Sequence, residues 1–249
     1  MTRGVLLFCF DTAHTNYHKI LERCVHLIKK NLKLEITVVT DYKTFKRTKP
    51  LGFVNYKFIE PELGNSKMGK EWNNVDRHRS YELSPYDTTL VMDIDYFCFT
   101  DNLLQFMDTS YDFLIPDKVH DLTDRNSFHQ RVWSMIPMVW ATVFIFKKTN
   151  KSKQIFDMIK YVKQNYAYFN QLYRIFGKNF RNDYAFAIAL QQLNGFVDYD
   201  KFPFALSTLP PDCEIVKFTE NGLAWKYSDQ INGIELQDVH VLNKEVADV

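Results

Sequence analysis

The stretch "TLVMDIDYF" (residues 89–97) places two aspartates, Asp93 and Asp95, at the end of an apolar run. A short run of apolar and β-branched residues predicts a buried strand. Residues two apart on a strand face the same way, so both carboxylates should project beyond its carboxyl end. In open α/β sheets that edge binds ligands, and paired carboxylates suit Mg²⁺ or Mn²⁺. We therefore expect a metal site here, where the ion would neutralise a departing phosphate.

A second D-x-D in the chain provides an internal control. Asp198-Tyr199-Asp200 has the same spacing, and ordinary aspartate usage predicts about one such pair by chance at this length. It follows only "FV" and runs into "KFPF", with no strand-like run before it. We assign the metal site to the first pair and expect the second to be a chance pair.

The rest of the chain alternates between strand-like and helix-like patterns. Apolar runs predict strands at 4–10, 34–41, 111–117 and 138–148, and helical spacing predicts helices at 17–32, 66–83 and 151–166. A helix at 182–195 would have Asn182 as its cap and Gly195 just past its end. Asn221-Gly222 predicts a hairpin, residues 117–130 a mobile polar loop, and residues 234–244 a last strand. This pattern predicts an α/β fold in one domain, with a mixed, mostly parallel central sheet flanked by helices.

Composition argues against several classes of protein, although the charge by itself neither demands nor excludes a nucleic-acid partner. The 249 residues carry a net charge of +1, whereas a protein that coats nucleic acid is usually more basic. The four cysteines are scattered and form no C-x-x-C pair, which argues against a zinc site or disulfide framework and favours a reducing compartment. The apolar stretch near the N-terminus is too short for a signal peptide or a membrane span. We expect a cytoplasmic protein without an integral membrane segment.

Two nucleotide-binding motifs are also excluded. No G-x-G-x-x-G is present among the 8 glycines, so the dinucleotide fingerprint is missing. The segment "GNSKMGKE" (residues 64–71) matches G-x-x-x-x-G-K, but Glu71 stands where a P-loop needs Ser or Thr to hold magnesium. A carboxylate at that position would also repel phosphate.

The block "YELSPYDTTLVMDIDYFCFTDNL" (residues 81–103) resembles the central block of GT-A-fold glycosyltransferases, in their glycogenin-like and lipopolysaccharide galactosyltransferase-like members. The resemblance implies one Rossmann-like GT-A domain over residues 1–249. Residues 1–103 would form its nucleotide-binding half, which ends in the D-x-D block, and residues 104–249 its acceptor- and sugar-binding half. It also implies metal-dependent transfer of a sugar from a nucleotide diphosphate sugar, expected to be a UDP-sugar, to an acceptor hydroxyl.

The same resemblance implies roles for individual residues. Asp93, Asp95 and His240 would hold Mn²⁺ or Mg²⁺, and Lys244 would touch the diphosphate. Asp183, in "RNDYAFAIAL", matches an acid near the donor sugar and is the catalytic candidate together with Arg79. The remaining donor-binding candidates are Phe10, Asp11, Thr12 and Tyr17 near the base, Arg77 and Arg79 near the phosphates, Ile94 within the D-x-D, and Trp140 and Ala141 beside the sugar.

Several alternatives stay open. Tyr17 could be only the first apolar residue of a helix, and His240 a merely packed residue. The asparagine and glycine usual in the family are replaced at Trp140 to Thr142. A sugar-phosphate nucleotidyltransferase would normally carry a glycine-rich loop after its first strand, which "FDTAHTNY" lacks; a non-catalytic relative is a third possibility. The acceptor, whether a glycan, a protein or modified nucleic acid, is not specified by any motif.

Overall fold

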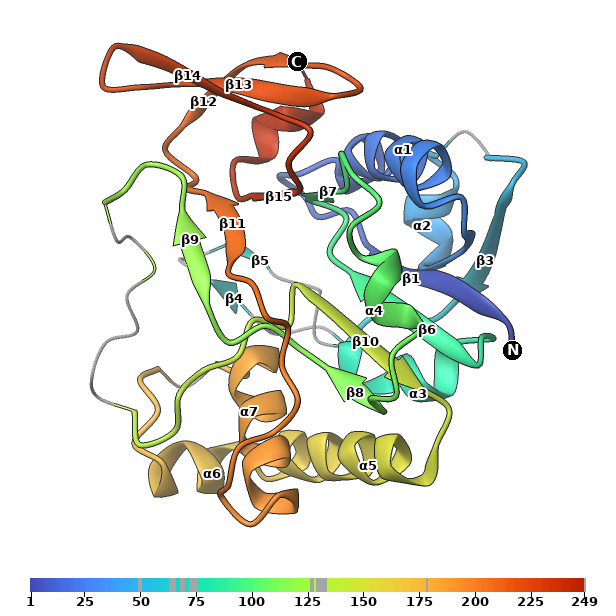
Figure 1. Ribbon diagram of the computed structural model, residues 1–249, viewed down its shortest axis with the longest axis vertical. Coiled ribbons are helices and arrows are strands. Elements are labelled where there is room, and N and C mark those ends of the chain that lie inside the picture. The colour runs from blue at the N-terminus through green and yellow to red at the C-terminus, as the bar shows by residue number, and fades with distance from the viewer. Residues whose placement is uncertain are drawn as a thin grey trace.

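The computed structural model describes residues 1–48, 51–62, 66–67, 70–71, 76–125, 128, 134–177 and 179–248. Within these residues the largest sheet has six strands in the order β3-β2-β1-β6-β10-β8 (Figure 1). Strands β1, β2, β3 and β6 run parallel, and β10 runs antiparallel to both β6 and β8. The expected mixed, mostly parallel sheet is thus confirmed. Its strands are β1 (Arg3–Cys9), β2 (Glu35–Thr40), β3 (Val54–Phe58), β6 (Thr88–Met92), β8 (Phe113–Leu114) and β10 (Val143–Lys147).

Helices cover both faces of the central sheet, as Figure 1 shows. On one face lies α1 (Tyr17–Leu27), which continues as a π-helical turn (Ile28–Leu32). On the other lie α5 (Asn150–Gln164), α6 (Tyr166–Leu172) and α7 (Asn182–Leu193). Alternate side chains of β1 enter the two cores: Val5 and Leu7 pack in the cluster that contains α1, and Leu6 and Phe8 in the cluster that contains α5 and α7. The part of a strand that is buried on both faces must be apolar, as β1 is after the exposed Arg3.

A second sheet brings the C-terminal part of the chain to the D-x-D. Its order is β7-β15-β11-β9, with β7 (Tyr96–Phe97), β9 (Val119–Asp121), β11 (Leu206–Leu209) and β15 (Val239–Val241). Strands β7 and β15 pair antiparallel, with His240 opposite Tyr96. This register places residue 240 beside residue 95, although 145 positions separate them in the sequence.

A third sheet, β12 (Glu214–Phe218), β13 (Gly222–Tyr227) and β14 (Gln230–Glu235), forms the top of the view in Figure 1. Its first turn is the hairpin predicted from Asn221-Gly222. A Cβ on Gly222 would lie 2.0 Å from the carbonyl oxygen of Ile234, so close approach of β14 requires the glycine. The second turn has Ser228 and Asp229 at φ 46° and 64°.

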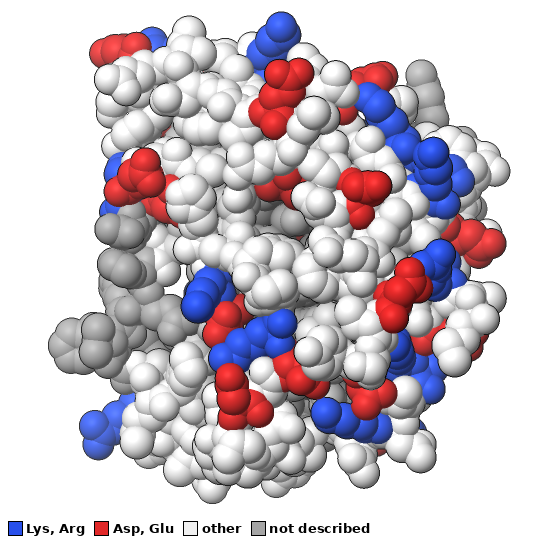
Figure 2. All heavy atoms as spheres, viewed as in Figure 1, with Lys and Arg blue, Asp and Glu red and all other residues white. Residues whose placement is uncertain are grey.

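The remaining elements of the described chain are short. They are α2 (Tyr42–Phe45), α3 (Ser80–Leu83), α4 (Leu104–Met107), the 3-10 turns η2 (Asp76–Arg79) and η3 (Lys244–Ala247), and the two-residue strands β4 (Ser66–Lys67) and β5 (Lys70–Glu71). Acidic and basic side chains are interspersed on the face drawn in Figure 2, without a patch of one sign. No helix in the described part of the chain is both long and apolar enough to span a bilayer.

Four expectations about elements are corrected. Of the described residues in the helix expected at 66–83, 76–83 are helical, whereas 66–67 and 70–71 are strands; a glycine such as Gly69 disfavours helix by about 1 kcal/mol. The loop expected at 117–130 contains β9, and residues 126–127 and 129–130 lie outside the described residues. The strand expected at 234–244 is divided between β14 and β15. Asn182 is the first residue of α7, and the cap position is Arg181, whose side chain pairs with Asp183.

Candidate active site

The backbone holds both aspartates of the D-x-D at the carboxyl end of β6. The N–H of Asp93 donates to the carbonyl of Thr142 (2.7 Å), which follows from the pairing of β6 with β10. The N–H of Tyr96 donates to the carbonyl of Asp93 (3.0 Å) and so closes the turn through Ile94 and Asp95. The carbonyl of Asp95 then accepts from the N–H of Val241 (2.8 Å). Three elements therefore fix the positions of the two carboxylates.

Asp93, Asp95 and His240 form a group of possible metal ligands. One ligand atom from each lies within 4.8 Å of the others. His240 Nε2 is 3.4 Å from Asp95 Oδ1, and His240 Nδ1 is buried without a hydrogen-bond partner in the described chain. Two carboxylates suit Mn²⁺ or Mg²⁺, and the Nε2 of His240, which faces Asp95, would be the third ligand atom. The residues present therefore fit a divalent ion.

Two protein cations contact the same carboxylates. The guanidinium of Arg77, with a side chain only 5% exposed, pairs with Asp93 and donates to the carbonyl of Ala141. The ammonium of Lys244 pairs with Asp95. Burial lowers the pKa of Arg77 to about 10, which leaves it charged at neutral pH. Burial alone would raise the pKa of Asp95, but Lys244 and His240 outweigh it and hold that pKa well below its usual range.

Asp183 lies in the first turn of α7, beside the segment that follows Trp140. Its Oδ1 accepts from the N–H of Ala141 (3.1 Å), and its Oδ2 pairs with Arg181 (2.9 Å). Burial opposes ionisation, yet Arg181 and the Ala141 N–H hold the pKa of Asp183 below its usual value. Because Arg77 binds the carbonyl of Ala141, the backbone of this one residue links Asp183 to the D-x-D.

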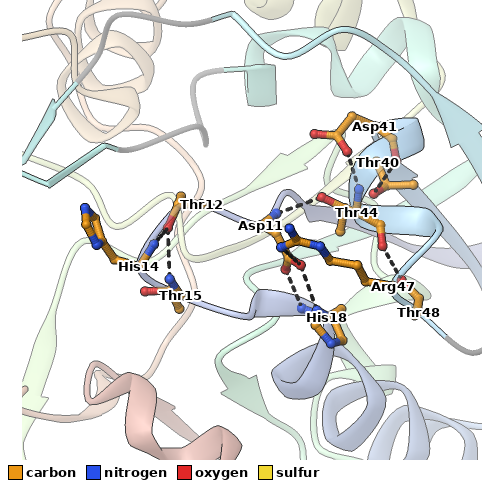
Figure 3. Close-up of polar contacts among 10 residues, drawn as sticks. All are labelled: Asp11, Thr12, His14, Thr15, His18, Thr40, Asp41, Thr44, Arg47 and Thr48. Carbon is orange, nitrogen blue, oxygen red and sulfur yellow. Dashed lines mark hydrogen bonds and ion pairs between the residues drawn. The ribbon is translucent and has the colours of Figure 1, made fainter.

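Figure 3 shows how the turn after β1 uses its own polar groups. The carboxylate of Asp11 has no exposed side-chain area; it accepts from the backbone N–H of His18 (3.0 Å) and pairs with His18 Nδ1 (2.8 Å) and Arg47 (3.5 Å). Its own N–H donates to Thr44 Oγ1 (2.8 Å). Asp11 therefore joins β1, α1 and α2, and its carboxylate is already occupied by three groups of the chain.

The other candidates near the base differ in what they contact. Phe10 is 5% exposed and packs in the core. Thr12 Oγ1 accepts from the N–H groups of His14 (3.3 Å) and Thr15 (3.1 Å), which closes the turn drawn in Figure 3. Tyr17 is mostly buried at the start of α1; burial raises its pKa, and Lys244 and Asp95 lie close enough to affect it. Of these three residues, Tyr17 is the one whose pKa Asp95 of the D-x-D affects.

Ile94 and Trp140 border the site in different ways. Ile94 is 5% exposed and its side chain packs in the core, so it faces the site only through its backbone between the two aspartates. Trp140 is partly exposed and donates its backbone N–H to the carbonyl of Pro116 (2.8 Å). It lines a cavity of about 350 Å³ with Tyr199 and Lys201, among others. This cavity adjoins the site through the Trp140–Ala141 peptide.

Arg79, one of the two catalytic candidates, is not brought to the D-x-D. Its guanidinium faces Asp76 (3.7 Å) and Glu82 (3.5 Å), both on its own helical segment. The sequence offered both Arg77 and Arg79 as candidates near the phosphates, and of the two it is Arg77 that contacts the D-x-D.

The second D-x-D lies at the surface, away from any such group of ligands. Asp198 has an 81% exposed side chain and pairs with Lys201 (2.7 Å), and Asp200 faces Lys151 (3.7 Å).

Sequence reasoning missed two basic residues that act on the candidates. Arg181, two positions before Asp183, stands at the cap position of α7 and pairs with Asp183 across the start of the helix. Arg47 reaches Asp11 although it is 36 positions away. No local signal predicts that contact, which depends on β1 and α2 lying side by side.

A second group of possible metal ligands comprises Glu62, which lies beyond the end of β3, and Asp76 and His78 in η2. Glu62 pairs with Lys163 (2.5 Å) and donates its backbone N–H to Asp76 (3.2 Å). Arg79 faces Asp76 (3.7 Å), so a protein cation lies beside each carboxylate, and we assign no metal to this group.

Comparison with known proteins identifies the fold. No family model and no curated protein matches the sequence. An active-site mutant of LgtC superposes with a TM-score of 0.50 at 15% identity, over 76% of this chain and 69% of that one. Mouse xyloside xylosyltransferase 1 superposes with a TM-score of 0.50 at 10% identity, over 80% and 85%. A complex of the galactosyltransferase LgtC with donor and acceptor sugar analogues gives 0.49 at 15%, over 76% and 70%. The chain therefore has the GT-A fold that residues 81–103 predicted.

Proposed function

We propose that this chain is a glycosyltransferase that moves a sugar from a UDP-sugar to an acceptor hydroxyl with the help of a divalent ion. One observation carries the proposal: on a GT-A fold, the first D-x-D and His240 gather at one strand end with Arg77 and Lys244 beside them. The fold neighbours include a galactosyltransferase and a xylosyltransferase, which supports transfer of a sugar. Residues 1–103 would bind the nucleotide and residues 104–249 the sugar and acceptor.

Asp93, Asp95 and His240 would hold Mn²⁺ or Mg²⁺. When bound, such an ion supplies Lewis-acid stabilisation of the charge on the departing diphosphate. Arg77, which is engaged by Asp93 and the carbonyl of Ala141, would hold Asp93 in place and add positive charge near the diphosphate, and Lys244 would add a mobile point charge. The proposal uses Arg77 in the role that Arg79 was expected to fill, because Arg77 lies on the D-x-D.

Asp183 would act through its charge and its hydrogen bonds. A carboxylate with a lowered pKa is a weak proton acceptor, so it suits binding of donor-sugar hydroxyls better than removal of the acceptor proton. Its negative charge beside the Ala141 segment would also stabilise positive charge that develops on the sugar in the transition state. Trp140 would supply an apolar wall on the acceptor side.

Tyr17 would contact the nucleotide close to Lys244. Asp11 and Thr12 would shape the base-binding turn through their backbone, because their side chains are engaged within the protein. Phe10 and Ile94 would support the site from the core.

The test is a donor screen with two product readouts. The protein is incubated with Mn²⁺ and a panel of nucleotide sugars, and both released UDP and released pyrophosphate are measured. Release of UDP that disappears in Asp95→Asn but not in the matched control Asp200→Asn supports sugar transfer. Release of pyrophosphate instead would indicate a nucleotidyltransferase. Absence of either product with every donor, together with unimpaired UDP binding, would indicate a non-catalytic relative.

A further inference from the structure

Two acids of the D-x-D are paired with two bases before any ligand binds. Among the described residues, Arg77 pairs with Asp93 and Lys244 pairs with Asp95. These four side chains therefore sum to zero charge. A divalent ion added alone would leave this weakly hydrated site with two excess positive charges, and a diphosphate added alone would leave it negative. An ion and a diphosphate added together come close to restoring neutrality.

Lys244 is the group on Asp95 that can move. His240 lies in β15, its side chain is 6% exposed, and the register with β7 holds it in place. Lys244 begins η3, and its side chain is 28% exposed on a flexible four-carbon stem. The backbone before it is anchored, because Asn243 accepts from the N–H of Glu245 (2.9 Å) and donates to the carbonyl of Cys213 (2.8 Å). The ammonium can therefore leave Asp95 by side-chain rotation alone.

We propose that Lys244 is an internal competitor for the metal: it occupies Asp95 in the free protein and is released only when a diphosphate offers it a new anion. This inference rests on the proposed function and adds the order of events at the same site. The metal and the nucleotide then bind cooperatively. Each offsets the excess charge that the other would leave at the site if it bound alone. Weak metal binding in the absence of donor would also limit unproductive occupancy of the site.

The test is a thermodynamic cycle on Mn²⁺ binding. Chelator-treated protein is titrated with Mn²⁺ by calorimetry, with and without saturating UDP, for the wild type, Lys244→Met and Lys244→Arg. Lys19→Met is the matched control, because Lys19 pairs with Asp248 (2.6 Å) beyond the same terminal turn but does not touch the D-x-D. Each variant is first compared with the wild type by circular dichroism, so that binding is measured on folded protein.

The expected results differ between the variants. In the wild type, UDP strengthens Mn²⁺ binding by a factor in the range of about 5–150 that is usual for coupled sites. In Lys244→Met, Mn²⁺ alone binds about tenfold more tightly than to the wild type, and the enhancement by UDP shrinks by a similar factor. Lys244→Arg keeps a cation on Asp95 and keeps the coupling, and Lys19→Met behaves as the wild type.

Two results would overturn the inference, and they are distinguishable. If the wild type binds Mn²⁺ with UDP but Lys244→Met binds Mn²⁺ alone no more tightly than the wild type, Lys244 is not a competitor, and the proposed function stands. If the wild type binds no Mn²⁺ with or without UDP, the metal site itself is absent, and the proposed function fails together with the inference.

Discussion

Replacement of Arg77 by methionine tests the buried ion pair that orders the D-x-D. The Arg77 side chain is 5% exposed and that of Asp93 is 18% exposed, and the same guanidinium satisfies the carbonyl of Ala141. Loss of one partner from a buried pair costs about 3–5 kcal/mol, because the other charge is left uncompensated. Water can partly reach Asp93, and methionine retains some packing. We therefore expect the free energy of unfolding of Arg77→Met to fall by about 3 kcal/mol, in urea titrations with EDTA at pH 7.5.

The matched control is Arg125→Met. Arg125 makes two short bonds to Asp212 (2.6 and 2.8 Å), but the two side chains are 29% and 55% exposed. An exposed pair contributes at most about 1 kcal/mol. The double variant Arg77→Met/Asp93→Asn should recover part of the loss, since it removes the unpaired charge. The reasoning is refuted if Arg77→Met costs no more than Arg125→Met, or if the double variant is less stable than the single one.

Two further predictions concern packing and pH. In Gly4→Ala the new Cβ would lie 2.3 Å from the ring of the buried Tyr86, whose hydroxyl forms a hydrogen bond with Thr37. The free energy of unfolding should therefore fall by about 2–4 kcal/mol. In a Tyr86→Ala background the same change should be nearly neutral. Burial raises the pKa of Asp238 to about 6, although the hydrogen bonds from Thr100 act to lower it. The folded protein therefore holds this proton more tightly than the unfolded chain does. As a result, the stability of the protein falls as the pH rises from about 4 to 6. Asp238→Asn should therefore be more stable than the wild type at pH 8 by up to about 3 kcal/mol, with a smaller advantage at pH 5; equal urea midpoints for the two proteins at both pH values would contradict this.

Most of the central sheet could be predicted because its inner strands are apolar on both faces and its helices carry the helical spacing. The edge strand β3, which is only partly buried and contains Asn55 and Lys57, was not expected. The D-x-D lies where the pattern of residues 89–97 placed it, since a buried strand must turn its first charged residues outward. The smaller sheets were harder. The break between β14 and β15 has Leu236 in the left-handed region (φ 50°) and no glycine to mark it, so the two strands merged in the sequence pattern.

The choice between Arg77 and Arg79 could not be made from sequence. Two residues apart in a helical segment face different directions, and the one that meets Asp93 depends on where the short turn η2 begins. The occupied carboxylate of Asp11 was equally hidden, because His18 and Arg47 come from two other elements. Such contacts follow from how elements pack, which local patterns do not record.

The most direct test of the account is whether UDP binds this site through a divalent ion held by Asp95. The melting temperature is measured with UDP alone, Mn²⁺ alone and both together, for the wild type, Asp95→Asn and the control Asp200→Asn from the second D-x-D. The account predicts a rise with both ligands in the wild type and in Asp200→Asn, larger than the sum of the separate effects, and its loss in Asp95→Asn. An unchanged rise in Asp95→Asn, or none in the wild type at millimolar ligand, would contradict it.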